Sequence, residues 1–325
     1  MRKNGILRCI GLIAFLGLAG AVAAQGFPVK PVRMVVGFAP GGAVDIVART
    51  IAAPMSDLLG QPVVIDTRPG ANGMLGADLV AKAPPDGHTI GLVSISSLVL
   101  NVHLYSKAPY HTLRDFTPIS NVGLLPFVIA VHPAVPARSL KELISLARSQ
   151  PGKLTVGTPG VGGLQHLTIE MLNSAAKVSL HHIPYKGTTP AMTDVMGGHI
   201  DAVIGGVPGI LEPHKAGRLR AVVVTDENRV AAMPDVPTAR EQGLPDLVVV
   251  NWYAIVGPAN LPAHTLNALH ASIVKGAALP ATQEKFTAAG VDVKTDPTPA
   301  AFAEYVRVEF ARWGTLVKNS GVRIE

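Results

Sequence analysis

The chain has 325 residues, enough for about two domains that each bury a core, so its length and its single cysteine exclude a small protein held by disulfides. Charged residues make up 15% of the sequence, against roughly 25% in typical soluble domains, while 33 Gly and 27 Pro separate many short apolar segments. The net charge is +6, but removing Arg2, Lys3 and Arg8 from the 28 Lys and Arg leaves 25 against 22 acidic residues, too small an excess for a nucleic-acid-binding surface.

The first 24 residues have the pattern of a secretory signal. A basic segment at residues 1–8 precedes an uncharged, mostly apolar run at residues 9–22, and small residues follow as far as Ala24. This run is shorter than the roughly 20 apolar residues that a membrane helix needs, although an uncleaved N-terminal anchor is the alternative interpretation. We therefore predict cleavage near Ala24 and export to the periplasm. Because Cys9 lies in this segment, the mature chain is predicted to have no disulfide and no thiolate metal site.

After the signal, apolar runs of strand length alternate with segments whose apolar residues recur at helical spacing. In the first half, strands are predicted at residues 31–38, 62–66 and 89–94, and helices at residues 44–59 and 74–83. In the second half, helices are predicted at residues 139–149, 164–175 and 190–197, and strands at residues 154–157, 180–184, 200–205 and 219–225. This alternation predicts an α/β fold in which each half is a mainly parallel sheet flanked by helices.

Two long extended stretches connect the two halves. Residues 116–132 and 247–257 are apolar without helical periodicity, and further helices are predicted at residues 264–278 and 298–319. We expect these C-terminal helices to return to the first half. The predicted lobes are residues 25–124 with 250–325, and residues 125–249. Two crossing segments between two α/β lobes predict a hinge with a cleft beside it.

A glycine-rich turn lies between a strand and a helix in each lobe. The first glycine loop is residues 37–42, and the second glycine loop is residues 159–163. Glycine lets a ligand approach the backbone, and free N–H groups at a helix N-terminus favour an anion. Two such loops facing one cleft would suit an anion held between the lobes. Each loop alone could equally be a tight turn with no ligand role.

Several polar residues near these loops are candidates for ligand contact. Asp45, in the first turn of a predicted helix, is expected to hold the amides of the first glycine loop, with contact to a ligand amine as the alternative. Ser94, Ser96 and Ser97 follow a strand at the end where parallel sheets bind ligands, either as hydroxyl donors or as turn caps. Lys186 would be a cation in the cleft, or its side chain would point to solvent.

The sequence offers no set of residues for metal binding or nucleophilic catalysis. His181 and His182 are adjacent and would face opposite sides of a strand, and together with His166 and His199 they match no metal-ligand spacing. The Gly-x-Ser-x-Gly motif of many hydrolases is absent. A periplasmic hydrolase is therefore the less favoured class, and we predict a binding protein with no cofactor.

Seven stretches together resemble the tripartite tricarboxylate transporter substrate-binding proteins, also called the Bug family. They are residues 32–49, 60–81, 82–88, 184–194, 197–201, 234–243 and 312–321. The resemblance covers essentially the whole mature chain. It implies a two-lobed, type II-like periplasmic solute-binding fold that captures a small carboxylate and delivers it to a membrane permease.

The resemblance also implies which residues contact the ligand. In the family, the first loop holds a carboxylate through backbone groups, and the matching residues here are Phe38, Ala39, Gly41, Gly42 and Asp45. In the second lobe the matching residues are Thr158, Gly160 and Gly162, with Tyr185, Lys186 and Gly187 close by.

This sequence departs from the family at two positions. Gln165 stands where the family commonly has serine, and Ser94 stands where it commonly has asparagine. Both positions would lie at the distal end of the ligand. The resemblance therefore does not imply which carboxylate is bound.

The sequence thus predicts an exported, non-enzymatic and monomeric binding protein. Its expected partners are a small carboxylate and the permease subunits of a tripartite carboxylate transporter, with no nucleic acid. The alternative function is ligand sensing, in which the liganded protein is presented to a sensor kinase.

Overall fold

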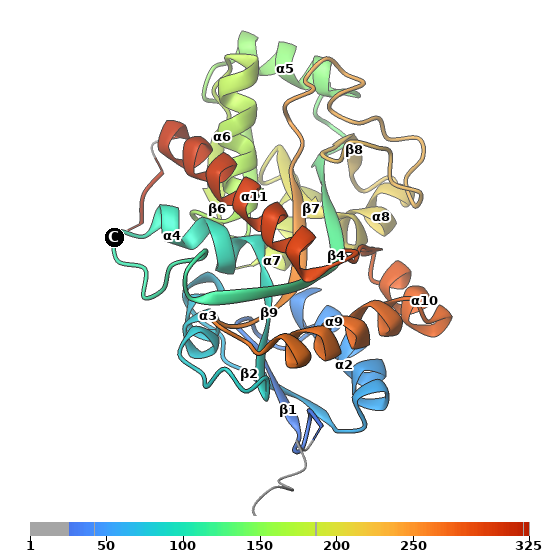
Figure 1. The fold of residues 1–325 in the computed structure, drawn as a ribbon. Helices are drawn as coiled ribbons and strands as arrows, with labels where there is room; N and C mark the ends of the chain where they lie inside the picture. Colours follow the sequence, from blue (N-terminus) through green and yellow to red (C-terminus); the bar gives the residue numbers. More distant parts are fainter. Residues whose placement is uncertain (1–25, 42, 186, 321, 325) are drawn as a thin grey trace, which may run out of the picture.

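The computed structural model describes residues 26–41, 43–185, 187–320 and 322–324. The predicted signal at residues 1–24 lies outside the described residues, as do Gly42 and Lys186. The chain forms two halves joined by long strands (Figure 1). Within the described ranges, no helix has both the length and the apolar character needed to cross a membrane.

The first lobe is built on three parallel strands, as its apolar runs predict. They are β1 (Val32–Val36), β2 (Val63–Thr67) and β3 (Thr89–Ser94), in the order β2-β1-β3. Three further strands pair antiparallel: β4 (Phe116–Val131), β9 (Val250–Pro258) and the short β10 (Asp292–Val293). The loops after β1 and β3 leave the sheet at the same edge, so both can supply residues to one site.

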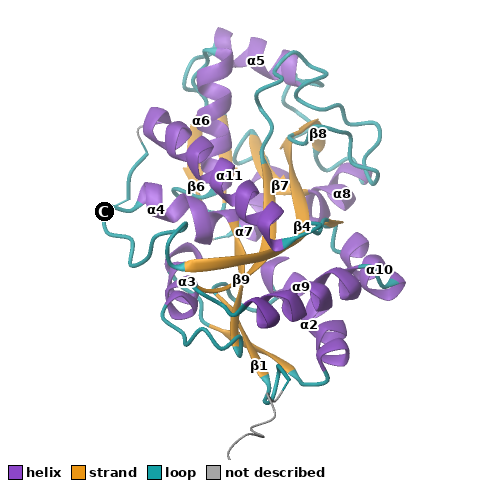
Figure 2. Cartoon of the chain, in the orientation of Figure 1, coloured by secondary structure: helices purple, strands orange, loops and turns teal. Residues whose placement is uncertain are grey.

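The second lobe repeats this plan. Its parallel strands are β5 (Thr155–Thr158), β6 (His181–Pro184) and β7 (Ala202–Gly206), in the order β6-β5-β7. Strand β8 (Arg220–Val224) and the far end of β4 pair antiparallel, and β7 pairs with β4. Figure 2 shows the strands inside each half with helices around them.

The long strand β4 belongs to both lobes. From Phe116 to Pro126 it pairs with β9, and from Phe127 to Val131 it pairs with β7 and β8. The sequence prediction of extended segments at residues 116–132 and 247–257 is therefore confirmed. We use "first lobe" and "second lobe" for the halves on either side of this change of partner, and the residue boundaries given above stay a prediction.

Helices cover both sheets. In the first lobe they are α2 (Ala43–Leu59), α3 (Met74–Ala81), α4 (Asn101–Leu104), α9 (Ala263–Ala277) and α10 (Pro280–Ala288), with the short turns η1 (Ala71–Gly73) and η2 (Ser96–Leu100). In the second lobe they are α5 (Leu140–Ser149), α6 (Leu164–Ala176), α7 (Thr188–Met196) and α8 (Val207–Lys215). The sequence pattern predicts neither α8, which contains Pro208 and Pro213, nor α10, which begins at a proline.

The last helix, α11 (Pro299–Ser320), lies across both lobes instead of returning to the first lobe alone (Figure 1). It packs against β4 and η2 and also against α6 of the second lobe. Its apolar face shares one hydrophobic core with residues of both lobes; the residues of this face are Phe302, Val306, Trp313 and Val317.

A single buried carboxylate on α11 joins the two tryptophans of the chain. Glu309 accepts hydrogen bonds on Oε2 from Nε1 of Trp252, at 3.3 Å, and from Nε1 of Trp313, at 3.0 Å. Trp252 lies on the crossing strand β9, so this contact ties α11 to the region where the lobes join. The tryptophans are part of the core and of this junction.

Candidate ligand-binding cleft

A cleft of about 510 Å³ lies between the lobes. Its first-lobe lining is Phe38, Val44, Asn72, Ser94, Ser96 and Tyr105, and its second-lobe lining is Pro159, Gly160, Val161, Gly163, Gln165 and Thr188. Asn251, on the crossing strand β9, completes it. None of these described lining residues carries a charge. The polar groups that they offer are hydroxyls, carboxamides and backbone amides.

The first glycine loop is held by the carboxylate of Asp45. The amide of Gly41 donates to Oδ2 of Asp45 at 3.0 Å, and Nε of Arg49 donates to the same oxygen at 2.9 Å. The Arg49 guanidinium lowers the pKa of this buried carboxyl, and the hydrogen bond from the Gly41 amide lowers it further. Burial alone would raise the pKa, but its effect is smaller than that of these two groups together. Asp45 thus has the loop-holding role that the sequence predicts. Of the predicted residues of this loop, Phe38 lines the cleft, whereas Ala39, Gly41 and Asp45 do not, and Gly42 is not described.

Asn72 was not predicted as a contact residue, although it lies in the stretch at residues 60–81 that resembles the family, and it reaches the cleft. It has a positive φ of 53°, and the fully buried Asn101 holds it there. Nδ2 of Asn101 donates to the carbonyl of Asn72 at 3.1 Å, and Nδ2 of Asn72 donates to Oδ1 of Asn101 at 3.3 Å. Apart from that resemblance, the signal in the sequence is the Asn-Gly pair, which is typical of tight turns.

The three predicted serines have different places. All three are buried, and Ser94 and Ser96 line the cleft whereas Ser97 does not. The Ser97 hydroxyl accepts from the amide of Ser94 at 3.0 Å and donates to the carbonyl of Ser94 at 3.2 Å. Ser97 therefore forms the turn after β3, the cap role that was the alternative for these serines.

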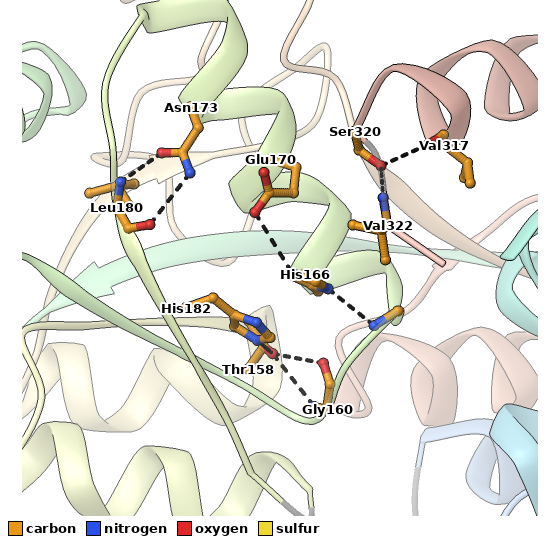
Figure 3. A network of polar contacts seen from close by, with 11 residues as sticks. Thr158, Gly160, His166, Glu170, Asn173, Leu180, His182, Val317, Ser320 and Val322 are labelled. Carbon is orange, nitrogen blue, oxygen red and sulfur yellow. Dashed lines mark hydrogen bonds and ion pairs between the residues drawn. The ribbon is translucent and has the colours of Figure 1, made fainter. Parts of the chain in front are cut away.

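The second glycine loop is held by hydroxyl and imidazole groups (Figure 3). Thr158 is fully buried, and its hydroxyl donates to the carbonyl of Gly160 at 3.0 Å and lies 2.6 Å from Nε2 of His182. The amide of Gly162 donates to Nδ1 of His166 at 3.1 Å. Thr158 and Gly162 take part in these supporting hydrogen bonds and do not line the cleft, whereas Gly160 and Gln165 line it.

The segment after β6 supports the same loop through its backbone. The amide of Tyr185 donates to the carbonyl of Thr158 at 2.9 Å, and the amide of Gly187 donates to that of Pro159 at 3.2 Å. The Tyr185 hydroxyl donates to Oδ2 of Asp194 at 2.7 Å, and burial together with this bond raises its pKa to about 12. Tyr185 and Gly187 do not line the cleft, whereas Thr188, which was not predicted, does. Lys186 lies outside the described residues.

Comparison with known proteins places this architecture among transport receptors. Residues 47–322 match the model of the tripartite tricarboxylate transporter family receptor. BugT from Bordetella pertussis is 34% identical over 327 residues, covering 100% of both chains.

Two solved structures extend the likeness to the whole fold. MatC from Rhodopseudomonas palustris, solved with bound malate, has a TM-score of 0.78 and 33% identity, covering 90% of this chain and 100% of MatC. A second R. palustris protein, solved with adipate, has a TM-score of 0.81 and 30% identity, covering 91% of this chain and 99% of that one.

Proposed function

The chain belongs to the tripartite tricarboxylate transporter receptor family, and we propose that it is a periplasmic solute-binding protein that captures a small organic carboxylate between its lobes and delivers it to a tripartite tricarboxylate-type permease. The family is one of transport receptors, which agrees with a binding role and not with an enzymatic one.

The observation that carries this proposal is the composition of the cleft. Both glycine-loop regions and the crossing strand supply its walls, and its described lining consists of neutral hydrogen-bonding and apolar groups. Helices α2 and α6 begin directly after the two loops, so the positive ends of both helix dipoles lie at the cleft. A carboxylate would be bound there by neutral donors from both lobes. Closure around the ligand follows because each lobe supplies only part of its contacts.

The ligands of the related structures support the same chemical class. The structure of MatC holds malate and that of the second R. palustris protein holds adipate, both small organic dicarboxylates. Their difference matters for this chain, because malate carries a hydroxyl group and adipate does not. We therefore use both as first probes.

The proposal is tested by native mass spectrometry of the protein purified from periplasm. The expected result is a chain that starts near Gln25 and retains a small carboxylate, whose mass identifies it. Uptake of that compound should then require both this protein and its permease. A chain that still begins at Met1, or transport that continues without the protein, would contradict the proposed location or the proposed delivery.

A further inference from the structure

Two histidines from different elements of the second lobe stack face to face behind the second glycine loop. His166 lies on α6 and His182 on β6, and their ring centroids are 3.9 Å apart with 17° between the ring planes (Figure 3). His166 bonds the amide of Gly162, and His182 bonds Thr158, from which the loop begins. The pair is therefore the direct support of the loop that brings Gly160 to the cleft.

The hydrogen bonds determine where each ring carries its proton. Nδ1 of His166 accepts from Gly162, so the neutral ring carries its proton on Nε2, which lies 3.7 Å from Oε1 of Glu170. The single hydroxyl proton of Thr158 is donated to the carbonyl of Gly160, so Nε2–H of His182 must donate to that hydroxyl. The bond from Gly162 therefore requires a neutral His166, whereas His182 can donate through Nε2–H in either protonation state.

Few charged groups face the pair from the elements packed around it. Among the described residues, α6 contributes Glu170 and β6 contributes His181, while β5 contributes only the Thr158 hydroxyl. No charge on α11 or at residues 322–324 shifts the pKa of either ring.

The surroundings favour the neutral rings. Burial lowers the pKa of His166. Burial, together with the neighbouring His166 and His181, lowers the pKa of His182 to about 4. Burial also raises the pKa of Glu170, which weakens the one anion that could favour a protonated ring.

We propose that His166 and His182 are positioning residues that hold the second glycine loop in its ligand-binding geometry only while the His166 ring is neutral, so that acid loosens the loop and releases the carboxylate. A proton taken up from solvent by His166 must add to Nδ1, where it would oppose the N–H of Gly162 and break that hydrogen bond. A second proton, on His182, would place two positive charges on rings whose centroids are 3.9 Å apart. That the released ligand is a carboxylate rests on the proposed function, whereas the loosening of the loop in acid does not.

The direction of the pH effect follows from the lowered pKa values. The folded loop disfavours a proton on Nδ1 of His166, so the hydrogen bond from Gly162 to that nitrogen is fully formed above the ordinary histidine pKa of about 6.5. That bond is lost as the pH falls from there through the lowered pKa of His166. A histidine that only contributes to packing would not make ligand affinity depend on pH in this way.

The first test needs no ligand. Amide hydrogen exchange, corrected for intrinsic rates, is compared at pH 7.5 and pH 5.0 for the two glycine loops. We expect exchange at residues 160–163 to accelerate about tenfold at pH 5.0, with the first loop unchanged. His166→Asn keeps an acceptor near the Nδ1 position but cannot take up a proton, so it should abolish the acceleration. His199→Asn, an exposed histidine of the same lobe, should behave as wild type. Equal acceleration in wild type and His166→Asn would overturn the proposal.

The second test uses malate and adipate as probes in calorimetric titrations at the same two pH values. Wild type and His199→Asn should lose about tenfold more affinity at pH 5.0 than His166→Asn, whose remaining loss reports protonation of the probe itself. Parallel losses in all three proteins would contradict the proposal. His182→Gln keeps a donor near Nε2 and leaves His166 in place, so it should lose affinity at pH 5.0 as wild type does. If neither probe binds at pH 7.5, that result counts against the proposed function for these compounds, and hydrogen exchange still decides the role of the histidines.

Discussion

The two glycine loops share a sequence pattern but are held by different chemistry. In the first loop, Gly41 has a φ of 81° with open space around the position of a Cβ atom, and an ionised carboxylate holds its amide. In the second loop, Gly162 has a φ of 75°, Ile324 from the C-terminal end packs where its Cβ would stand, and a neutral imidazole holds its amide.

This difference shows what the strand–glycine–helix pattern can and cannot predict. The pattern places a loop at the carboxyl end of a sheet strand, but the groups that stabilise the loop come from elsewhere in the chain. The first loop should tolerate added atoms and mild acid. The second loop should tolerate neither, because it is closely packed and one of its supporting hydrogen bonds requires a neutral His166.

The largest difference is expected when a methyl group is added to each loop. Gly162→Ala should lower the free energy of unfolding by about 3 kcal/mol, because a positive φ and overlap with Ile324 both oppose the new Cβ. Gly41→Ala should lower it by only about 1 kcal/mol, since that position has the positive φ but open space. Chemical denaturation of both variants measures the difference.

A double-mutant cycle isolates the packing contribution. Ile324→Ala should recover the part of the Gly162→Ala loss that comes from overlap, with a coupling free energy of about 1–2 kcal/mol. The part caused by the positive φ should remain. Equal losses for the two glycine variants, with no coupling to Ile324, would show that the second loop is not held by this contact.

A smaller effect is expected from removing the carboxylate of the first loop. Asp45→Ala should lower the free energy of unfolding by about 1.5 kcal/mol, because it removes the acceptor of the Gly41 amide and of Arg49. Asp57→Ala, at an exposed position of the same helix, is the matched control and should change it little.

The pH dependence of this contribution distinguishes the two loops further. The pKa of Asp45 is lowered, so its stabilisation is fully present above the ordinary aspartate value of about 3.9 and is lost as the pH falls through the lowered value. The stability difference between wild type and Asp45→Ala should therefore be constant from about pH 7 to 5 and shrink below about pH 4. A difference that already shrinks between pH 7 and 5 would contradict the carboxylate support.

The smallest effects separate two serines that the sequence predicts as equals. Ser97→Ala should lower the free energy of unfolding by about 1 kcal/mol without changing ligand affinity, because its hydroxyl bonds only the backbone of Ser94. Ser96→Ala should leave stability nearly unchanged and lower the affinity for a bound carboxylate about fivefold. Thermal melts and titrations of the same two variants measure both quantities, and the reverse pattern would refute this assignment.

The sequence predicts the fold well because most of its signals are local. Apolar periodicity places each of β1 to β9 near its observed bounds, and the apolar crossing segments correctly indicate a connection between two lobes. The helix α8 is missed because Pro208 and Pro213 interrupt its pattern. The position of α11 across both lobes is missed because periodicity identifies an apolar face but not the surface that this face covers.

The cleft is predicted less completely because its residues come together only in three dimensions. Phe38, Ser94, Ser96, Gly160 and Gln165 are predicted as candidates and line it. Asn72, Tyr105 and Asn251 stand in segments whose sequence carries no ligand-binding motif. The same limit hides the stacked histidine pair, whose members lie on α6 and β6 and match no spacing in the chain.

The most direct test of the central claim, that one small carboxylate is held between the two lobes, is calorimetric titration of Gly160→Leu beside Gly209→Leu. A Cβ at Gly160 would have only the carbonyl oxygen of Tyr185 nearby, at 3.8 Å, so leucine can enter the cleft without backbone strain. Gly209, exposed on α8 with no neighbouring atom within 4 Å, is the matched control. A carboxylate that binds wild type should bind Gly209→Leu equally and Gly160→Leu about a hundredfold more weakly, a loss of about 2.7 kcal/mol. Unchanged binding by Gly160→Leu would show that the carboxylate is held elsewhere.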